Sequence, residues 1–306
     1  MMRPALLLLS AALASALPLL CASCAVEWTS PEERPEVRVV FLDVGQGDAA
    51  LLSAGNRHWL LDAGSAGRGL PARLAQRGVD SLAGIFLTHR HEDHFGGAAE
   101  VLRAIPVGKV HLSGDPSRSD LWNAFEKTLR ESGVPADTLW RGDWIEFCAS
   151  GLDCVPGEWG LRVLWPHHGL LHEGNNASLV MQLATPAART LFMGDADREV
   201  EEELVSIEGA RLESEVLKVG HHGSKTSSAL PFLAEVRPMR AVVSVGSRNN
   251  HGHPDAAVLA DLALVLDDAA RVLRTDELSD VEIVFGPAGF YEKDLGEETA
   301  EAWARW

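Results

Sequence analysis

Residues 88–97 read THRHEDHFGG and place three histidines and two carboxylates within six consecutive positions. His89, His91, Asp93 and His94 follow the spacing H-x-H-x-D-H. Imidazole and carboxylate together are ligands for zinc, manganese or iron, and an ordinary surface loop has no need of such crowding. The sequence therefore predicts a metal centre at this position.

Two further segments supply candidate ligands far away in the sequence. LFMGDAD places Asp195 directly after an apolar strand and a glycine, and LKVGHHGSKTSS places His221 and His222 at the end of another buried strand. Taken alone, Asp195 is typical of a helix N-cap, because REVEEEL follows it. Together with the first cluster, these segments favour a shared carboxylate and a distant imidazole in a site for two metal ions.

The elements that must position these residues are short, and they come both in meandering groups and alternating with helices. This mixture favours two mixed sheets packed face to face with helices outside, and it disfavours a simple parallel doubly wound sheet. Strands are expected at 37–43, 48–54, 58–64, 82–89, 143–147, 159–164, 178–184, 189–193, 215–220 and 240–246 and near 271 and 281, and helices at 69–77, 95–105, 198–207, 228–236 and 255–266.

The chain has 306 residues, of which 46% are hydrophobic, and a formal net charge of -17. This composition suits one large α/β domain, predicted at residues 37–290, with an acidic C-terminal tail at 291–306. The negative charge argues against indiscriminate binding of nucleic acid. Arg68, Arg73 and Arg77 are interpreted as a solvated helix face, with a basic strip beside the cleft as the alternative.

The N-terminal segment predicts export. One arginine precedes an apolar stretch that ends at Leu20, which is too short to span a bilayer comfortably and is typical of a secretory signal. We expect a signal peptide at 1–24, a linker at 25–36, and a periplasmic or other extracytoplasmic location. Lipid attachment to the membrane through Cys24 or Cys21 is a further expectation, because these cysteines follow the apolar region.

Cys148 and Cys154 are the only cysteines after the signal segment. In an oxidising compartment they predict a short-loop disulfide. Two free thiols at a metal site are the alternative, which the lack of a paired C-x-x-C disfavours.

Seven motifs resemble the metallo-β-lactamase superfamily and, within it, the extracytoplasmic hydrolase-like domain of competence DNA-uptake proteins of the ComEC type. The resemblance covers nearly all of residues 37–290. It implies a four-layer αββα sandwich, with two mixed sheets and outer helices, and two divalent metal ions, zinc or manganese. The matching segments are FLDVGQGDA (41–49), LLDAG (60–64), THRHEDHFGG (88–97), NNASLV (175–180), LFMGDAD (191–197), LKVGHHGSKTSS (217–228) and SVGSRNNHGHP (244–254).

The resemblance also implies roles for individual residues. His89 and His91 would bind one metal ion, and Asp195 would bridge it to the second. The other ligands of the second ion would be Asp93, His94 and His221. The superfamily usually adds a third histidine to the first ion, and the loop before NNASLV leaves these candidates open: His167, His168, His172 and Asn176.

Two metal ions would lower the pKa of a bridging water enough to give hydroxide near neutral pH. His222 and His253 are candidates for orienting the substrate or protonating a leaving group, and Asp43 and Asp62 are expected to support ligand histidines. The predicted catalytic residues are Asp93, Asp195, His222 and His253, and the predicted substrate-binding residues are Ser224, Lys225, Thr226 and Asn249.

The leading hypothesis is a metal-dependent hydrolase of phosphodiester bonds, in single-stranded DNA or in a smaller substrate. One alternative is an acyl hydrolase for lactams, lactones or thioesters, because the same hydroxide attacks carbonyl groups. Another is an exported binding protein without activity, which the complete set of six ligands disfavours. No polytopic membrane segment follows residue 24, so the chain is not expected to conduct DNA itself.

Overall fold

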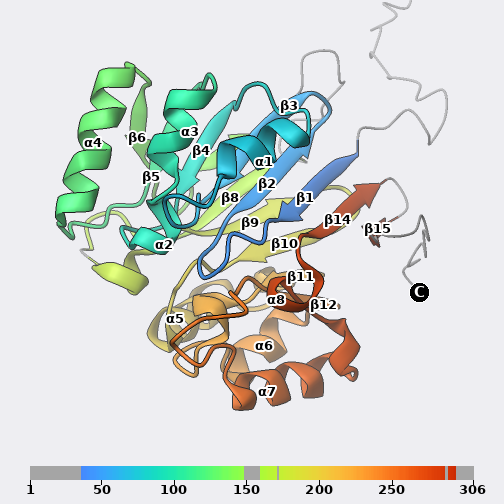
Figure 1. Ribbon diagram of the computed structural model, residues 1–306. Coiled ribbons are helices and arrows are strands. Elements are labelled where there is room, and N and C mark those ends of the chain that lie inside the picture. The colour runs from blue at the N-terminus through green and yellow to red at the C-terminus, as the bar shows by residue number, and fades with distance from the viewer. Residues whose placement is uncertain (1–35, 148–158, 171, 287–288, 294–306) are drawn as a thin grey trace, which may run out of the picture.

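The computed structural model describes residues 36–147, 159–170, 172–286 and 289–293. Two β-sheets pack face to face, and helices cover the outer face of each sheet (Figure 1). This arrangement confirms the predicted α/β sandwich of two mixed sheets with outer helices.

The first sheet has eight strands in the order β15-β14-β1-β2-β3-β4-β5-β6. Pairing is antiparallel from β15 to β3 and parallel from β3 to β6. Its strands are β1 (Val37–Phe41), β2 (Ala50–Ala54), β3 (Arg57–Leu61), β4 (Gly84–Leu87), β5 (Val110–Leu112), β6 (Ala136–Thr138), β14 (Val281–Gly286) and β15 (Gly289–Lys293).

The second sheet has seven strands in the order β13-β12-β11-β10-β9-β8-β7. Pairing is parallel from β13 to β10 and antiparallel from β10 to β7. Its strands are β7 (Trp144–Glu146), β8 (Gly160–Trp165), β9 (Val180–Ala184), β10 (Arg189–Phe192), β11 (Val216–Lys218), β12 (Arg240–Val243) and β13 (Val272–Arg274).

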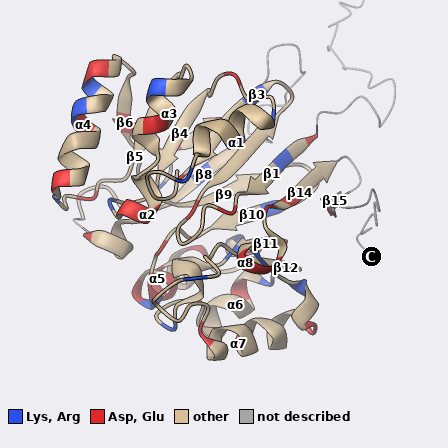
Figure 2. Ribbon diagram, viewed as in Figure 1, with Lys and Arg blue, Asp and Glu red and all other residues tan. Residues whose placement is uncertain are grey.

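Helices α1, α3 and α4 cover the first sheet, and α5, α6 and α7 cover the second (Figure 1). Helix α4 carries acidic and basic residues along its length (Figure 2), and its Asp120, Lys127, Arg130 and Glu131 are exposed. The helices are α1 (Leu70–Gln76), α2 (Glu92–Phe95), α3 (Ala98–Ala104), α4 (Asp120–Ser132), α5 (Arg198–Glu208), α6 (Leu230–Val236), α7 (Ala256–Leu266) and α8 (Thr275–Leu278).

Alternation along the strands builds the layers. Val39 and Phe41 of β1 belong to the core between the two sheets, whereas Val40 belongs to the core beneath the helices. This follows from the two-residue period of a strand, which turns successive side chains to opposite faces. Full burial of one such side chain stabilises the fold by about 1.5–3 kcal/mol, so both faces of each sheet hold the sandwich together.

Several elements differ from those predicted. No element is predicted for residues 106–142, where the structure has β5, α4 and β6. The helix expected from Phe95 onward instead starts at Glu92, and the chain forms α2 and then α3. β15 reaches Lys293, three residues into the segment predicted as a tail from Tyr291.

Other predictions fall where the structure gives no description. The predicted signal peptide, nearly all of the predicted linker, Cys148 and Cys154 lie outside the described residues. None of the helices in the described part of the chain is long and apolar enough to cross a membrane.

Candidate metal centre

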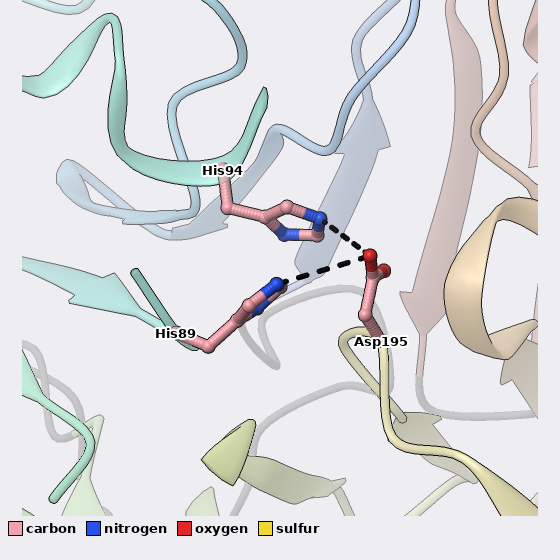
Figure 3. A group of neighbouring side chains, drawn as sticks. All are labelled: His89, His94 and Asp195. Atoms are coloured by element: carbon pink, nitrogen blue, oxygen red, sulfur yellow. Dashed lines mark ion pairs between the residues drawn. The ribbon is translucent and has the colours of Figure 1, made fainter. Parts of the chain in front are cut away.

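Loops that follow three buried strands bring the predicted ligands together. β4 leads into Thr88 and His89, β10 leads into Asp195, and β11 leads into the 3-10 helix Gly220–Gly223. Nε2 of His94 lies 3.2 Å from Oδ2 of Asp195, and Nε2 of His89 lies 3.8 Å from the same oxygen (Figure 3). Both rings therefore point at one carboxylate from a distant part of the sequence.

A second group of ligands lies beside the first and shares Asp195 with it. Nε2 of His222 is 3.3 Å from Oδ2 of Asp93 and 3.5 Å from Oδ2 of Asp195. Ligand atoms of Asp93, His94 and His222 lie within 4.8 Å of one another, as do those of His89, His94 and Asp195. Asp195 therefore lies between two groups, where a bridging carboxylate is predicted.

The atoms that face this centre are buried, and within the described part of the chain they make no hydrogen bond. They are Nε2 of His89, His94 and His222 and Oδ1 of Asp195. A buried polar atom without a partner costs about 1–3 kcal/mol, so their convergence requires a reason. Imidazole nitrogen and carboxylate oxygen are the donors that bind zinc, manganese or iron. These side chains therefore fit divalent metal ions.

The charges of the centre reinforce this fit. Burial, with His94 next to it, lowers the pKa of His89 well below its usual range, so its ring is neutral. Burial opposes ionisation of Asp195, yet His222 and His94 hold the pKa of that carboxyl well below its usual range. Burial disfavours the charged forms of His94 and His222. Asp195 and Asp62 nevertheless raise the pKa of His94 well above its usual range, and Asp195 and Asp48 raise the pKa of His222 to about 10. The carboxylates thus stabilise positive charge, which metal ions can supply while displacing the histidine protons.

Asp62 supports the centre, as its predicted role requires. Its Oδ2 lies 2.7 Å from Nδ1 of His94, and its two oxygens accept hydrogen bonds from the backbone N–H and hydroxyl of Thr88 at 2.8 and 2.7 Å. A partner on Nδ1 fixes the ring and directs Nε2 at the centre. Asp43, by contrast, accepts a hydrogen bond from the backbone of Gly45 at 3.0 Å and makes none to a described histidine.

Nδ1 of His222 lies 2.9 Å from the carbonyl oxygen of Ser244, and a buried ion pair of Asp48 and Lys218, a lysine with no predicted role, lies beside it. Oδ1 of Asp48 lies 3.2 Å from Nδ1 of His222, and Oδ2 lies 2.7 Å from Nζ of Lys218. Both charged side chains are buried. A lysine inside the apolar run of β11, directly before the histidine pair, is the sequence signal that could have found this interaction.

The structure brings His222, and not His221, to Asp93 and His94. Nδ1 of His221 lies 3.1 Å from Oδ1 of Asp197 and 3.0 Å from Oγ1 of Thr226. Both histidines have left-handed backbone conformations, with φ of 47° and 51°. This unusual turn sends the two neighbouring rings in different directions, and only His222 reaches the predicted position of His221.

The predicted substrate-binding residues mostly hold their own loops. Oγ of Ser224 accepts a hydrogen bond from the backbone N–H of Thr226 at 3.3 Å, and the Thr226 hydroxyl donates to Asp197 at 2.5 Å. Lys225 is exposed. Nδ2 of Asn249 donates to the carbonyl oxygens of Gly246 and His253 at 2.9 and 2.8 Å.

A cleft of about 470 Å³ opens beside the centre. Arg68 lines it, whereas Arg73 and Arg77 pair with Asp280 and do not form a basic strip along it. None of the four predicted substrate-binding residues is in its lining, which consists of Gln46, Ser65, Arg68, His91, Glu92, Asp93, Asn175, Asp195, His221, His222, His251 and His253.

The four candidates for a third ligand of the first metal ion also lie elsewhere. The rings of His167 and His172 pack on Trp165, with ring centroids 5.1 and 4.4 Å apart, and His168 packs on Trp140 at 5.0 Å. Oδ1 of Asn176 accepts a hydrogen bond from the backbone N–H of Asp197 at 3.1 Å. Asn175 lies in the cleft instead.

Comparison with known proteins agrees with this architecture. A profile of the Metallo-beta-lactamase superfamily matches residues 42–247, and the chain belongs to this superfamily. Competence protein ComA of Neisseria gonorrhoeae is 33% identical over 264 residues, which are 85% of this chain and 34% of that protein. ComE operon protein 3 of Bacillus subtilis is 30% identical over 79% of this chain and 32% of that protein. The chain thus spans about a third of the length of these relatives.

Solved structures show the same fold at low sequence identity. CmlA, a diiron β-hydroxylase from Streptomyces venezuelae, has a TM-score of 0.51 and 13% identity over 81% of this chain and 54% of that chain. Igni18, a metallo hydrolase from Ignicoccus hospitalis, has a TM-score of 0.50 and 15% identity over 82% of this chain and 98% of that chain. These similarities support the fold alone.

Proposed function

We propose that the protein is a metal-dependent hydrolase of phosphodiester bonds that uses two divalent ions, zinc or manganese. The observation that carries this proposal is the convergence of buried donor atoms without hydrogen-bond partners in the described structure. His89, His91 and Asp195 would hold one ion, and Asp93, His94, His222 and the shared Asp195 the other. His91 is exposed, and its ring lies beside that of His89, with centroids 4.5 Å apart.

When bound, such ions would supply a hydroxide near neutral pH and stabilise charge on the attacked centre. The protein's own side chains would do the rest. Asp62 holds the ring of His94. The carbonyl oxygen of Ser244, 2.9 Å from Nδ1, holds the ring of His222 with Asp48 beside it, so that both Nε2 atoms stay directed at the centre. His222 would therefore serve as a ligand and not in the catalytic role predicted for it. His253 lies in the cleft, where burial and the neighbouring His221 lower its pKa, and its neutral ring can accept a proton.

Arg68 supports an anionic substrate. Among the described residues that line the cleft it is the only lysine or arginine. Its guanidinium lies against Gly45, where an added Cβ would be 3.3 Å from Cζ of Arg68. Glu92 and Glu100 accept hydrogen bonds from residues 65–67 at 2.7 to 3.1 Å and so fix the loop that carries it. The planar guanidinium that this loop presents to the cleft can bind two phosphate oxygens at once.

The names of the relatives support a nucleic acid as the substrate. One relative is Competence protein ComA, and another, Recombination protein 2 of Haemophilus influenzae, matches 75% of this chain at 31% identity. Single-stranded DNA is therefore the polymer that we propose to test first, beside a generic phosphodiester.

The test compares the wild-type protein with Asp195→Asn and with Asp137→Asn as a matched control. Asp137 lies on β6, outside the cleft lining, and pairs with Lys109 and His111. We expect wild type and the control to hydrolyse bis(p-nitrophenyl) phosphate and single-stranded DNA with added Mn²⁺ or Zn²⁺. Asp195→Asn should lose at least a hundredfold, because it removes the ligand shared by both ions.

Other results would redirect the proposal. Turnover of a lactam, lactone or thioester panel without turnover of phosphodiesters would replace it by an acyl hydrolase. Bound metal without turnover of any substrate would support a catalytically silent binding protein. Equal rates for wild type and Asp195→Asn would contradict the metal mechanism altogether.

We also propose export, with lipid attachment at Cys24 or Cys21 as one form of it. The support is the apolar N-terminal segment of the sequence. Mass spectrometry of the N-terminal peptide from expressing cells tests both points. A lipid-modified cysteine would show an anchored protein, a free mature N-terminus would show simple cleavage, and an intact Met1 would contradict export.

A further inference from the structure

The first proposed metal position has three protein ligands so far, two imidazoles and one shared carboxylate. Catalytic zinc sites can function with three protein ligands and a water, whereas manganese favours more ligands and oxygen donors. Any further protein ligand must lie in the cleft and present an atom that is not already used. The described cleft residues can therefore be compared by where their donor atoms point.

Asn175 meets this condition. It belongs to the 3-10 helix Gly174–Ala177 and lines the cleft together with His91 and Asp195. Gly174, with φ of 57°, brings the backbone up to His91: an added Cβ there would lie 3.6 Å from Nε2 of that histidine. Oδ1 of Asn175 is buried and accepts no hydrogen bond from the described residues.

The hydrogen bonds of Asn175 fix which way its amide faces. Nδ2 lies 3.3 and 3.4 Å from the two ring nitrogens of His221. The Asn175 side chain also hydrogen-bonds to Asp197. A carboxylate can only accept, so the group of Asn175 that meets Asp197 is the NH₂ group. The carbonyl oxygen is left for another partner.

The competing side chains are used elsewhere. His221 is held by Asp197 and Thr226. Among the carboxylates, Glu92 accepts hydrogen bonds from Ser65 and Ala66 at 2.9 and 3.1 Å. His253 also has a buried Nδ1 without a described partner, but its ring lies against His221 and His251, at centroid distances of 5.6 Å from each. Apart from Asp195, Asn175 is therefore the cleft residue with a buried oxygen that the rest of the described structure leaves unused.

We propose that Oδ1 of Asn175 is a further ligand of the first metal ion and that it makes this position prefer manganese to zinc. The proposal rests on the two-metal centre proposed above. With Asn175, the position has two imidazole nitrogens and two oxygens. Carboxylate and carbonyl oxygens suit manganese, whereas a third imidazole would give a set of nitrogen ligands typical of zinc.

The experiment measures metal binding directly, so that activity is not needed as the readout. Metal-free protein is titrated separately with Mn²⁺ and Zn²⁺ by calorimetry, and the bound metal after desalting is counted by mass spectrometry. The variants are Asn175→Ala, Asn175→Asp and Asn175→His, with Asn176→Ala as the matched control. The amide of Asn176 bonds to Asp197 and Glu199, outside the cleft lining.

We expect two bound ions in wild type, Asn176→Ala and Asn175→Asp, because aspartate keeps an oxygen donor. Asn175→Ala should bind the first Mn²⁺ at least tenfold more weakly. Asn175→His should move the ratio of Zn²⁺ to Mn²⁺ affinity at least tenfold towards zinc. If Asn175→Ala does not fold, the aspartate and histidine variants still decide the question through that ratio.

Two contrary results are distinguishable. If wild type binds two ions, and the alanine and histidine variants match its affinities for both metals, Asn175 is not a ligand and this inference fails alone. If wild type binds neither metal, the two-metal centre fails and this inference fails with it.

Discussion

Replacing Lys218 by methionine tests the buried ion pair beneath the candidate centre. Nζ of Lys218 lies 2.7 Å from Oδ2 of Asp48, and both side chains are buried. Loss of one partner of such a pair leaves an uncompensated charge and costs about 3–5 kcal/mol. Burial alone would raise the pKa of Asp48, but Lys218 and His222 lower it from 3.8 to about 2, which is worth about 2 kcal/mol. Because His222 remains, we expect a loss of about 3 kcal/mol in the free energy of unfolding.

Urea unfolding of the metal-free protein, followed by circular dichroism at neutral pH, measures this loss. The double variant Lys218→Met with Asp48→Leu removes both charges and should recover much of the stability. It should nevertheless bind metal about tenfold more weakly, because His222 loses the carboxylate beside Nδ1, while the carbonyl oxygen of Ser244, 2.9 Å from Nδ1, still holds the ring. A single variant within about 0.5 kcal/mol of wild type, or a double variant with wild-type metal affinity, would refute this reasoning.

Three further predictions address Glu201 of α5, which accepts hydrogen bonds from the backbone of Ser228 and Ala229, and two residues of the site. Burial raises the pKa of Glu201 from 4.5 to about 7, so its contribution to stability is full below pH 4.5 and is lost as the pH rises through 7, by up to about 3 kcal/mol. Glu201→Gln should flatten that part of the stability profile in urea unfolding, and unchanged profiles would contradict the shift. His222→Ala should lose one bound metal ion by mass spectrometry while His221→Ala keeps both, and the opposite order would restore the assignment predicted from the sequence. Arg68→Ala should raise KM for a phosphodiester about tenfold, the value of one charge-assisted contact, with little change in kcat, and an unchanged KM would exclude Arg68 from substrate binding.

The local part of the candidate site could be predicted because it lies within one motif. His89, Asp93 and His94 are close in the sequence, and a strand followed by a helix is enough to place them side by side. Asp195 could be predicted because a glycine after a buried strand leaves a carboxylate free to enter a cleft. The sandwich followed in the same way from the mixed order of strands and helices.

The distinction between His221 and His222 could not be predicted, because it depends on two left-handed backbone conformations that are uncommon for any residue with a side chain. Lys218 belongs to β11 of the second sheet, whereas Asp48 lies in the loop between β1 and β2 of the first, so no local pattern reveals their pairing.

Helix α4, in contrast, had a local signal. Ser119 caps its start, and Trp122, Phe125 and Leu129 are its buried apolar residues at helical spacing.

Asn175 could not be distinguished from its neighbours in the loop, because its unused oxygen is defined only by contacts with distant residues.

The central claim is that two metal ions share Asp195. Crystals grown with Mn²⁺ and measured above and below the manganese absorption edge locate those ions directly by their anomalous scattering. We predict two peaks about 3.5–4 Å apart, one beside His89 and His91 and the other beside Asp93 and His222, with Asp195 between them. A site with no anomalous peak, or a single peak that does not contact Asp195, would contradict the two-metal centre.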